Sequence, residues 1–498
     1  MKLAKHSCRN APLPIPYGKL VTTSSLGVVF VILPAISLLL NPIRLLVNYA
    51  TRVKEGSFMF ETFQQEVEGA HLSLYVFNIT NADRFMSGVD ENLQVEEVGP
   101  FTYAETRQNV DVDLHDEEGV MWFTPKMKLR FVPEKSVSRP ELLNVTVPNL
   151  ALLSATSLIS QYPYLIKNAF NLFVRHLKSE PVITLDVHSY LWGYPDPLIA
   201  VAKRLVPGLI NFDNFGIVDR LYENSTMYRM KVGVTDGDRF SIKSLMKYRR
   251  EDFDAKLDPI ESYKFENTYE GVAYPPGLSP QTPISIYRLG VCRTFDLVFQ
   301  ETKTMEYGFD AWLYRINNST FARDCNTDFC GMMDLSKCTF GIPIGMSKAH
   351  FLHADPKIYK RVKGLRPNQE AHDSFFLVEP TIGFTLSASL ALQMNINLGD
   401  ISFNEVTSSF SNMVVPVVYI KVVQQDVFET VKGILRLIHV IGPRILLATE
   451  ITLFIIGFAF LAYSIHIYKN NTYSIDQRKK CLEINEKQNA PLIAYLKT

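Results

Sequence analysis

Two stretches of the chain are apolar without the interruptions typical of a globular fold. The first covers residues 20–47 and contains the unbroken core Leu26–Leu40, and the second, Ile445–Ile467, has the full length that a bilayer requires. We expect both to be transmembrane helices. No small-residue cleavage site follows Leu40, which argues against a cleaved signal peptide. Glu450 lies near the start of the second stretch, so we expect its carboxylate to reach the lipid head groups.

Strand-like patterns are spread over the whole region between these stretches. Lys126–Phe131 and Arg229–Val234 alternate polar and apolar residues, as half-buried strands do. Leu72–Ile79, Phe384–Leu398 and Pro416–Val423 are apolar on both faces and predict strands of a well-buried sheet. Because these segments come from both ends of the region, we expect their strands to meet in one core.

A helical region lies among these strands. Leu150–Gln161 and an amphipathic segment after Pro163 predict a helical hairpin, and Leu198–Val206 predicts a third short helix that ends at Pro207. The apolar rows of the amphipathic segment are Leu165, Ile166, Ala169, Phe170, Phe173, Val174 and Leu177, and its polar residues are Lys167, Asn168, Asn171, Arg175 and Lys178. We expect the apolar rows to face the core and the polar residues to face solvent.

Charges that flank the two apolar stretches predict the topology. Residues 1–19 carry Lys2, Lys5, Arg9 and Lys19 without an acid, and the tail after Ile467 is also rich in lysine and arginine. Because such residues prefer the cytoplasmic side, both ends are expected in the cytoplasm. The predicted parts are a cytoplasmic N-terminus (1–19), a span (20–47), a lumenal or extracellular ectodomain (48–440) with a helical cap (150–208), a second span (441–467) and a cytoplasmic tail (468–498).

Composition and motifs exclude several classes of function. Lys plus Arg number 51 and Asp plus Glu number 51, so no excess positive charge exists to bind nucleic acid. No GxSxG, HExxH, P-loop or GxGxxG-after-strand motif occurs. We therefore expect no enzyme, no catalytic residue, no cofactor and no metal. His350 and His353 are interpreted as hydrogen-bonded structural histidines.

Glycosylation motifs agree with the predicted topology. The sequon asparagines between the spans are Asn78, Asn144, Asn224, Asn317 and Asn318. Asn317 and Asn318 overlap, so we expect at most one of the two to be modified. A further match at Asn470 falls in the predicted cytoplasmic tail, where it should stay unmodified.

Six cysteines divide in the same way. Cys8 and Cys481 lie on the cytoplasmic ends, where a free thiol and a palmitoylated one are both open alternatives. The lumenal four are Cys292, Cys325, Cys330 and Cys338. In an oxidising compartment this even set predicts two disulfides with three open connectivities. A zinc site made of the last three and His350 is disfavoured, because CxxxxC is not a usual zinc spacing.

Short motifs in a fixed order resemble the CD36-type class B scavenger receptors across nearly the whole chain. They are Tyr75–Asn81, Glu96–Tyr103, Leu191–Tyr194, Asp196-Pro197, Cys292-Arg293, Gly341–Pro343, His350–Leu352, Pro367–His372, Glu379–Gly383 and Gln393–Asn395. The resemblance implies an α+β membrane protein whose ectodomain is an antiparallel β-barrel with a helical cap and an apolar tunnel. Ala349 departs from the pattern, since the family usually has proline there.

The same resemblance implies a function. A member of this family would bind lipids, such as fatty acids, sterols or lipoprotein-like particles, and conduct lipid through its ectodomain toward the membrane. The alternative is a plasma-membrane receptor for particles or partner proteins without net lipid transfer. Cationic cap residues bind ligands in the family, which implies Lys167, Arg175 and Lys178 as candidates here.

The cysteines and the tail are similar to those of the lysosomal member of the family. The similarity implies the disulfides Cys292–Cys338 and Cys325–Cys330. Pro491, Leu492 and Ile493 resemble a dileucine-type sorting signal, although Gln488 replaces the usual acid. We therefore expect the protein to reside in the endolysosomal membrane, with the plasma membrane as the alternative location. We also expect adaptor binding to the cytoplasmic tail, which contains the sorting signal Pro491, Leu492 and Ile493.

Overall fold

The computed structural model describes residues 17–205, 213–218, 226–249, 258–259, 265–306, 308–322, 330–336, 339, 341–424, 427 and 429–495. Its helices are α1 Tyr17–Leu40, α2 Pro42–Ala50, α3 Phe58–Gln64, α4 Ala82–Met86, α5 Leu150–Ile159, α6 Tyr164–Leu177, α7 Val187–Trp192, α8 Pro197–Leu205, α10 Gln369–His372, α11 Glu429–Arg436 and α12 Gly442–Tyr495. The chain forms two units. The terminal unit holds residues 1–46, 307–309 and 432–498, and the sheet domain holds residues 47–306 and 310–431.

The strands are β1 Val67–Ile79, β2 Leu93–His115, β3 Val120–Phe131, β4 Asn144–Pro148, β5 Val182–Asp186, β6 Tyr194–Pro195, β7 Asn214–Phe215, β8 Thr226–Gly233, β9 Ile242–Arg249, β10 Asp258–Pro259, β11 Thr268–Tyr269, β12 Ile284–Arg288, β13 Arg293–Thr304, β14 Asp310–Ile316, β15 Met332–Asp334, β16 Ile344–Lys348, β17 Val362–Lys363, β18 Phe375–Glu379, β19 Phe384–Leu398 and β20 Met413–Gln424. Each segment that the sequence analysis assigned to a strand lies in one of them except for Val234, which directly follows β8, so those predictions are confirmed to within one residue.

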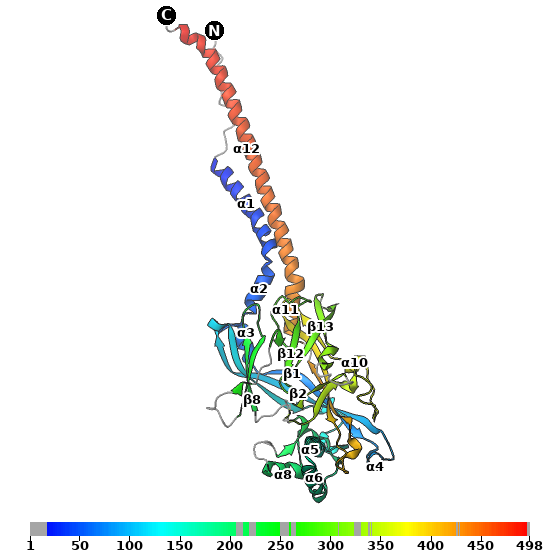
Figure 1. The fold of residues 1–498 in the computed structure, drawn as a ribbon. Coiled ribbons are helices and arrows are strands. Elements are labelled where there is room, and N and C mark those ends of the chain that lie inside the picture. The colour runs from blue at the N-terminus through cyan, green and yellow to red at the C-terminus, as the bar shows by residue number, and fades with distance from the viewer. Residues whose placement is uncertain are drawn as a thin grey trace. The chain divides into compact units, whose positions relative to one another are not determined.

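Helices α1 and α12 run side by side in the terminal unit (Figure 1), and both are long and apolar enough to cross a bilayer. They approach closely at two glycines, because a Cβ atom on Gly457 would lie 2.8 Å from Val31 and one on Gly27 would lie 2.8 Å from Leu461. Small residues at a helix crossing are typical of packed membrane helices. The two predicted spans therefore form one packed pair.

Polar contacts lie along the same helix pair. The hydroxyls of Thr23 and Ser464 are 2.6 Å apart, and the Ser37 hydroxyl donates to the Glu450 carboxylate at 2.6 Å. Glu450 is only 5% exposed. The expectation that its carboxylate reaches the head groups is thus wrong, because α1 covers it and supplies a hydrogen-bond donor.

The predicted first span is divided between α1 and α2. Asn41 between them has a left-handed backbone with φ of +46°, and Pro42 has no N–H to continue the helical hydrogen bonds of α1. Residues 20–40 thus belong to α1, and the remainder of the predicted segment belongs to α2.

Most described strands of the sheet domain form one 16-stranded sheet with the main path β10-β9-β8-β3-β2-β1-β20-β19-β18-β14-β13-β12-β11, while β4–β5 and β6–β7 form two separate two-stranded sheets. Strands from both ends of the chain meet at its centre, where β1 pairs with β20 and β20 with β19. Most pairs are antiparallel, but β11–β12 and β17–β2 are parallel. The sheet is therefore mainly antiparallel with two short parallel pairs, in agreement with the predicted α+β fold built on an antiparallel β-barrel core.

The sheet curls so that strands near its two ends share a core. One buried cluster joins Phe123 of β3, Met230 of β8 and Ile242 of β9 to Tyr287 of β12. Because β12 lies near the opposite end of the strand order from β8 and β9, this contact makes the sheet nearly closed. The sheet domain is thus a near-closed β-sheet with helices, as the α+β prediction requires.

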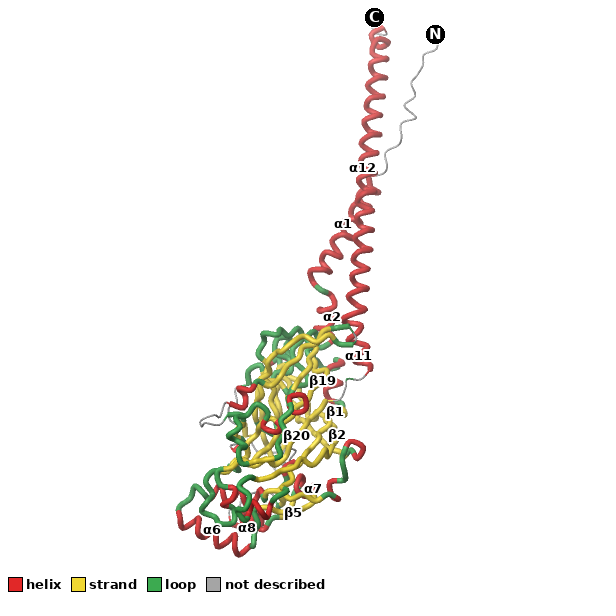
Figure 2. The backbone as a smooth tube through the Cα atoms, turned by 90° about the vertical axis from the view of Figure 1, so that its right-hand side faces the viewer, coloured by secondary structure: helices red, strands yellow, loops and turns green. Residues whose placement is uncertain are grey.

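Helices α5, α6 and α8 gather at one end of the sheet domain (Figures 1 and 2). Asn149 begins α5 because its side chain accepts the N–H of Leu152 at 3.1 Å, and Pro163 precedes α6. The predicted helical hairpin is confirmed, and α8 confirms the third helix up to Leu205. Pro207, its predicted end, lies outside the described residues.

Candidate functional site

Helix α6 in the cap carries apolar residues on two faces. Its inner face belongs to a cluster formed by Leu152, Phe170, Phe173, Val174, Leu177, Leu198 and Val406. On its outer face Leu165 is 79% exposed and Leu172 is 68% exposed. Tyr162 and Tyr164 beside them are also exposed. Contiguous exposed apolar side chains of this kind mark interaction surfaces on soluble domains. We call Tyr164, Leu165 and Leu172 the outer face of α6, and Tyr162 lies just before the helix.

The polar side of α6 docks against the chain after β19. The Asn171 side chain donates to the Phe403 carbonyl at 2.8 Å and accepts from the Asn404 side chain at 2.9 Å. This docking turns Leu165 and Ala169 toward solvent. Ile166 is also 45% exposed, so the expectation that these three residues face the core is wrong, because the periodicity does not reveal which polar residues have a partner.

The three predicted ligand-binding cations differ in their surroundings. Lys167 Nζ lies 5.3 Å above the Phe403 ring, and Arg175 forms a 2.6 Å ion pair with Glu405. Lys178 ends α6 in a left-handed conformation and has no side-chain partner among the described residues. Lys167 and Arg175 thus both contact the short segment that contains Phe403 and Glu405, and Lys178 has no contact of this kind within the described part of the chain. Their role as ligand residues stays a prediction.

The core face of β3 is incompletely covered. Along its second half the side chains of Lys126, Lys128 and Arg130 are exposed, whereas those of Met127, Leu129 and Phe131 alternate with them and are half-buried. Leu129 and Phe131 pack against the main core. These core-facing side chains therefore keep some accessible apolar area.

A cluster of titratable groups lies on β2 and the covering segment 349–374. His350 Nε2 lies 2.5 Å from Glu97 Oε2, and the rings of His350 and His372 stack with centroids 4.3 Å apart. The possible ligand atoms of these three residues all lie within 4.8 Å of one another. A metal site is therefore the first hypothesis to test.

Hydrogen bonds at the far side of both rings argue against a metal. The backbone N–H of Arg366 donates to His350 Nδ1 at 3.1 Å, and that of Asn368 donates to His372 Nδ1 at 3.0 Å. Each neutral ring therefore carries its proton on Nε2, which leaves no lone pair there for a cation. A metal-bound histidine instead donates from its second nitrogen. The cluster suits a hydrogen bond from His350 to Glu97, not metal binding.

The histidine cluster fastens the covering segment to the sheet. The His372 ring lies 5.6 Å from that of Tyr419, which stacks on Tyr75 at 4.7 Å. The backbone N–H of His350 donates to the side-chain oxygen of Gln393 at 2.7 Å. Burial, with help from His350, lowers the pKa of His372 to about 4. This pKa keeps the buried His372 neutral over most of the physiological pH range.

The predicted glycosylation sites have different surroundings. Asn144 and Asn318 are exposed, and Asn78 and Asn317 are half-buried. The Asn78 side-chain oxygen accepts the N–H of Thr146 at 2.8 Å. Asn224 lies outside the described residues. Modification of these sites stays a prediction.

Cys292 and Cys330 each form a disulfide. A disulfide sulfur cannot serve as a thiolate ligand, so the alternative zinc site is contradicted at Cys330. Cys325 and Cys338 lie outside the described residues, so the Cys292–Cys338 and Cys325–Cys330 pairing stays a prediction. Cys481 on α12 is also disulfide-bonded in the structure, which differs from both alternatives considered for it.

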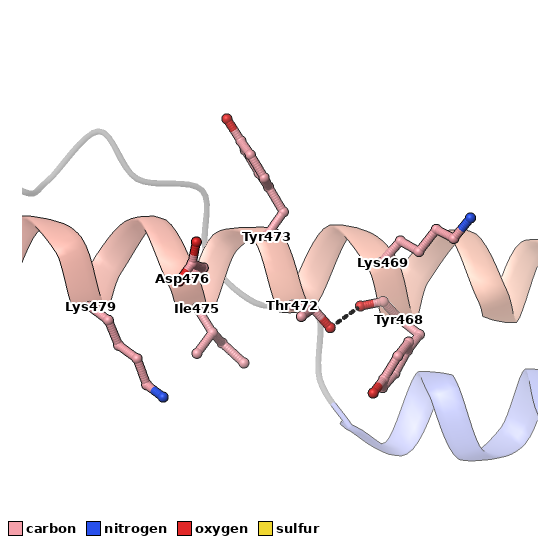
Figure 3. Close-up of a pocket in the computed structure, with 7 residues that line it drawn as sticks. All are labelled: Tyr468, Lys469, Thr472, Tyr473, Ile475, Asp476 and Lys479. Carbon is pink, nitrogen blue, oxygen red and sulfur yellow. Dashed lines mark hydrogen bonds between the residues drawn. The ribbon is translucent and has the colours of Figure 1, made fainter.

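The tail is the continuation of α12. The predicted sorting residues Pro491, Leu492 and Ile493 belong to its last turns, and their side chains lie outside the described residues. Closer to the span, a shallow surface is lined by Tyr468, Lys469, Thr472, Tyr473, Ile475, Asp476 and Lys479. Figure 3 shows that these side chains come from one helix, with Tyr473 and Lys469 on one side and Tyr468, Ile475 and Lys479 on the other. This surface lacks the convergent polar groups of a binding site.

Sequence reasoning missed the partnership of Glu97, His350 and His372. Each residue lies in one of the quoted motifs, but those motifs are far apart in the chain and nothing in their spacing pairs them. Only the pairing of β1 with β2 and the path of segment 349–374 bring them together.

Comparisons with known proteins agree with the fold. The model of the CD36 family matches residues 25–468. Scavenger receptor class B member 1 of Sus scrofa is 25% identical over 441 residues, which cover 86% of this chain and 84% of the relative. Lysosome membrane protein 2 of Rattus norvegicus is 26% identical over 382 residues, which cover 74% of this chain and 77% of the relative.

Proposed function

Because this chain belongs to the CD36 family, we propose that it is a receptor that captures lipids or lipid-bearing particles at its cap and passes lipid through its ectodomain toward the membrane. It acts by binding and shielding apolar molecules, and no catalytic step is required. The observation that carries the proposal is the outer face of α6, where Leu165 and Leu172 are 79% and 68% exposed.

The physical basis is the burial of apolar surface. Each square ångström of apolar area removed from water contributes about 25 cal/mol. Leu165 and Leu172 would insert into a lipid surface, and the accessible core face of β3 at Leu129 and Phe131 offers an apolar path for a single lipid molecule. Lys178, which has no side-chain partner in the described part of the chain, would contact anionic groups at the particle surface.

Binding to lipid particles tests the cap directly. Full-length protein is immobilised, and its binding to phosphatidylcholine vesicles that contain cholesteryl ester is measured. The double variant Leu165→Ser, Leu172→Ser should bind at least about tenfold more weakly, since two leucines contribute about 1.5 kcal/mol or more each when buried. Leu142→Ser is the matched control, because Leu142 is 77% exposed but lies outside α6. If both variants bind the vesicles equally well, the outer face of α6 is not the lipid-binding surface.

We also propose the endolysosomal membrane as its location. The support is the tail sequence Pro491–Ile493 together with relatives named lysosome membrane protein 2. Other relatives carry the name scavenger receptor class B member 1, and the alternative remains a plasma-membrane receptor without net lipid transfer. Confocal microscopy of the wild type beside a Leu492→Ala, Ile493→Ala variant separates the two. The variant should shift to the cell surface, and surface location of both proteins would refute the endolysosomal proposal.

A further inference from the structure

Two buried tyrosine hydroxyls and a guanidinium in the main core lack hydrogen bonds. Tyr274 is 0% exposed and Tyr314 is 1% exposed. Neither hydroxyl, nor the buried Nε of Arg288, has a hydrogen-bond partner of standard geometry in the described part of the chain. Buried polar groups are nearly always hydrogen-bonded, and each unsatisfied one is unfavourable. Three such groups in one region therefore require an explanation.

Arg288 lies beside Gly271, and Tyr274 and Tyr314 are linked to the same region through the chain and the strand pairing. A methyl group placed on Gly271 would lie 3.6 Å from Arg288 Nη2 and 3.6 Å from the Phe376 ring. Phe376 is directly opposite Tyr314 in the pairing of β14 with β18. Tyr274 follows three residues after Gly271, and its N–H donates to the Gly383 carbonyl at 2.7 Å. Gly271 has φ of +91°, which side chains rarely adopt, and a Cβ atom there would also lie 3.3 Å from the Ile286 side chain.

Electrostatic coupling supports their proximity. Burial raises the pKa of Tyr274, the Thr385 hydroxyl and the Arg288 charge lower it, and Tyr314 raises it further. The Thr385 hydroxyl does not satisfy Tyr274, because it donates to the Gly271 carbonyl at 2.8 Å and no hydrogen bond of standard geometry joins it to the tyrosine.

The chemistry of these groups selects a ligand. A guanidinium offers donors only, and a tyrosine hydroxyl donates readily to an anion. Arg288 forms no ion pair with any described residue. It also stays partly exposed, although it projects from the same face of β12 as the fully buried core residue Ile286. Accessible space thus reaches an unneutralised cation that is surrounded by apolar side chains, and an isolated charge in such surroundings is unfavourable.

We propose that Arg288, Tyr274 and Tyr314 bind the anionic head group of a single-chain lipid, a carboxylate or a phosphate, while its apolar chain lies along Ile286 and Phe376. This inference rests on the proposed function, namely that lipid enters the ectodomain. It adds that the interior discriminates between charged and neutral lipids.

The test compares three lipids with the same chain. Binding of oleate, oleoyl lysophosphatidate and methyl oleate to full-length protein in nanodiscs is measured for the wild type and for Arg288→Gln. The wild type should bind at least one anion more tightly than the ester. Arg288→Gln should weaken the binding of that anion about tenfold or more, since a hydrogen bond to a charged group is lost. The binding of methyl oleate should stay unchanged. If Arg288→Gln weakens the binding of oleate alone, the site binds a carboxylate. If it weakens the binding of oleoyl lysophosphatidate alone, the site binds a phosphate.

A second variant guards against misfolding. Tyr274→Phe with Tyr314→Phe removes only two oxygen atoms that have no partner, so the unliganded protein should unfold at the same or a higher temperature, while the rise in unfolding temperature caused by the anion should shrink. Tyr190→Phe is the control, because its hydroxyl is also buried without a hydrogen bond but belongs to α7. The proposed site is overturned if a variant weakens the binding of the ester as much as that of the anions, or if neither variant weakens the binding of an anion. If the wild type binds none of the three lipids, the proposed function fails with it.

Discussion

Arg107 on β2 donates from Nη2 to both carboxylate oxygens of Glu270, at 2.8 and 2.7 Å, although Glu270 follows β11 at the far end of the strand order. The two side chains are only 20% and 19% exposed. The ion pair therefore joins two distant parts of the sheet within the curled sheet domain.

Breaking this pair should destabilise the sheet domain. Arg107→Leu or Glu270→Leu leaves one charge without its partner in a mostly buried place, and we expect each to lower the free energy of unfolding by roughly 3 kcal/mol. The measurement is thermal unfolding of the purified protein in detergent.

Two comparisons make that result interpretable. The double variant Arg107→Leu, Glu270→Leu should recover much of the loss, because no unpaired charge remains. Arg84→Gln removes a pair with Asp90 in which the arginine is 65% exposed and should change stability little. If the double variant loses as much free energy of unfolding as the two single variants together, the account of the ion pair is contradicted.

The close approach of α1 and α12 should depend on Gly457. Gly457→Leu adds a side chain that meets Val31 and the backbone of α1, so the helices should separate. The reporter is Thr23→Cys with Ser464→Cys, whose hydroxyl oxygens are 2.6 Å apart in the native side chains. Oxidation should cross-link this pair efficiently in the parent and poorly with Gly457→Leu. Ala459→Leu, at an exposed position of α12, should leave the cross-link intact.

Sequence pattern predicted the architecture well where one physical signal dominates. The apolar length of the spans and the strand-like runs such as Phe384–Leu398 correspond closely to observed elements. Pattern alone did not orient α6, because the contacts of Asn171 with the segment after β19 are long-range. It also did not predict that Ser37 covers Glu450, since that depends on how two spans pack.

The same limit applies to the candidate sites. Lys167 and Arg175 were identifiable as cap cations, but their contacts with Phe403 and Glu405 come from residues more than two hundred positions away. The region around Arg288 and Tyr274 has no sequence signature, because a missing partner is visible only when the whole core is assembled.

Acid should weaken the attachment of the covering segment at His372. Burial, then the neighbouring His350, lowers the pKa of His372 from 6.5 to about 4, with Lys421 acting in the same direction and Glu97 opposing. Between these two values the unfolded chain binds a proton that the folded chain does not, so stability falls as the pH drops through this window. A single proton contributes at most about 1.4 kcal/mol per pH unit.

Unfolding temperatures at pH 7, 6 and 5 check this dependence. In His372→Asn the side-chain oxygen can still accept the Asn368 N–H, and the decline with acid should be shallower than in the wild type. His115→Asn, which replaces an exposed histidine, should keep the wild-type slope. An unchanged slope in the His372 variant would show that other groups cause the acid sensitivity.

Lipid transfer into the receptor's own membrane tests the central claim most directly. Full-length protein is reconstituted in vesicles with its sheet domain outward, and donor particles carry a fluorescent fatty acid or sterol. We predict that the wild type accelerates transfer over protein-free vesicles, and that Leu165→Ser with Leu172→Ser reduces the rate at least several-fold while Leu142→Ser does not. Particle binding without any acceleration of transfer would contradict the account and favour a receptor that holds particles without moving their lipid.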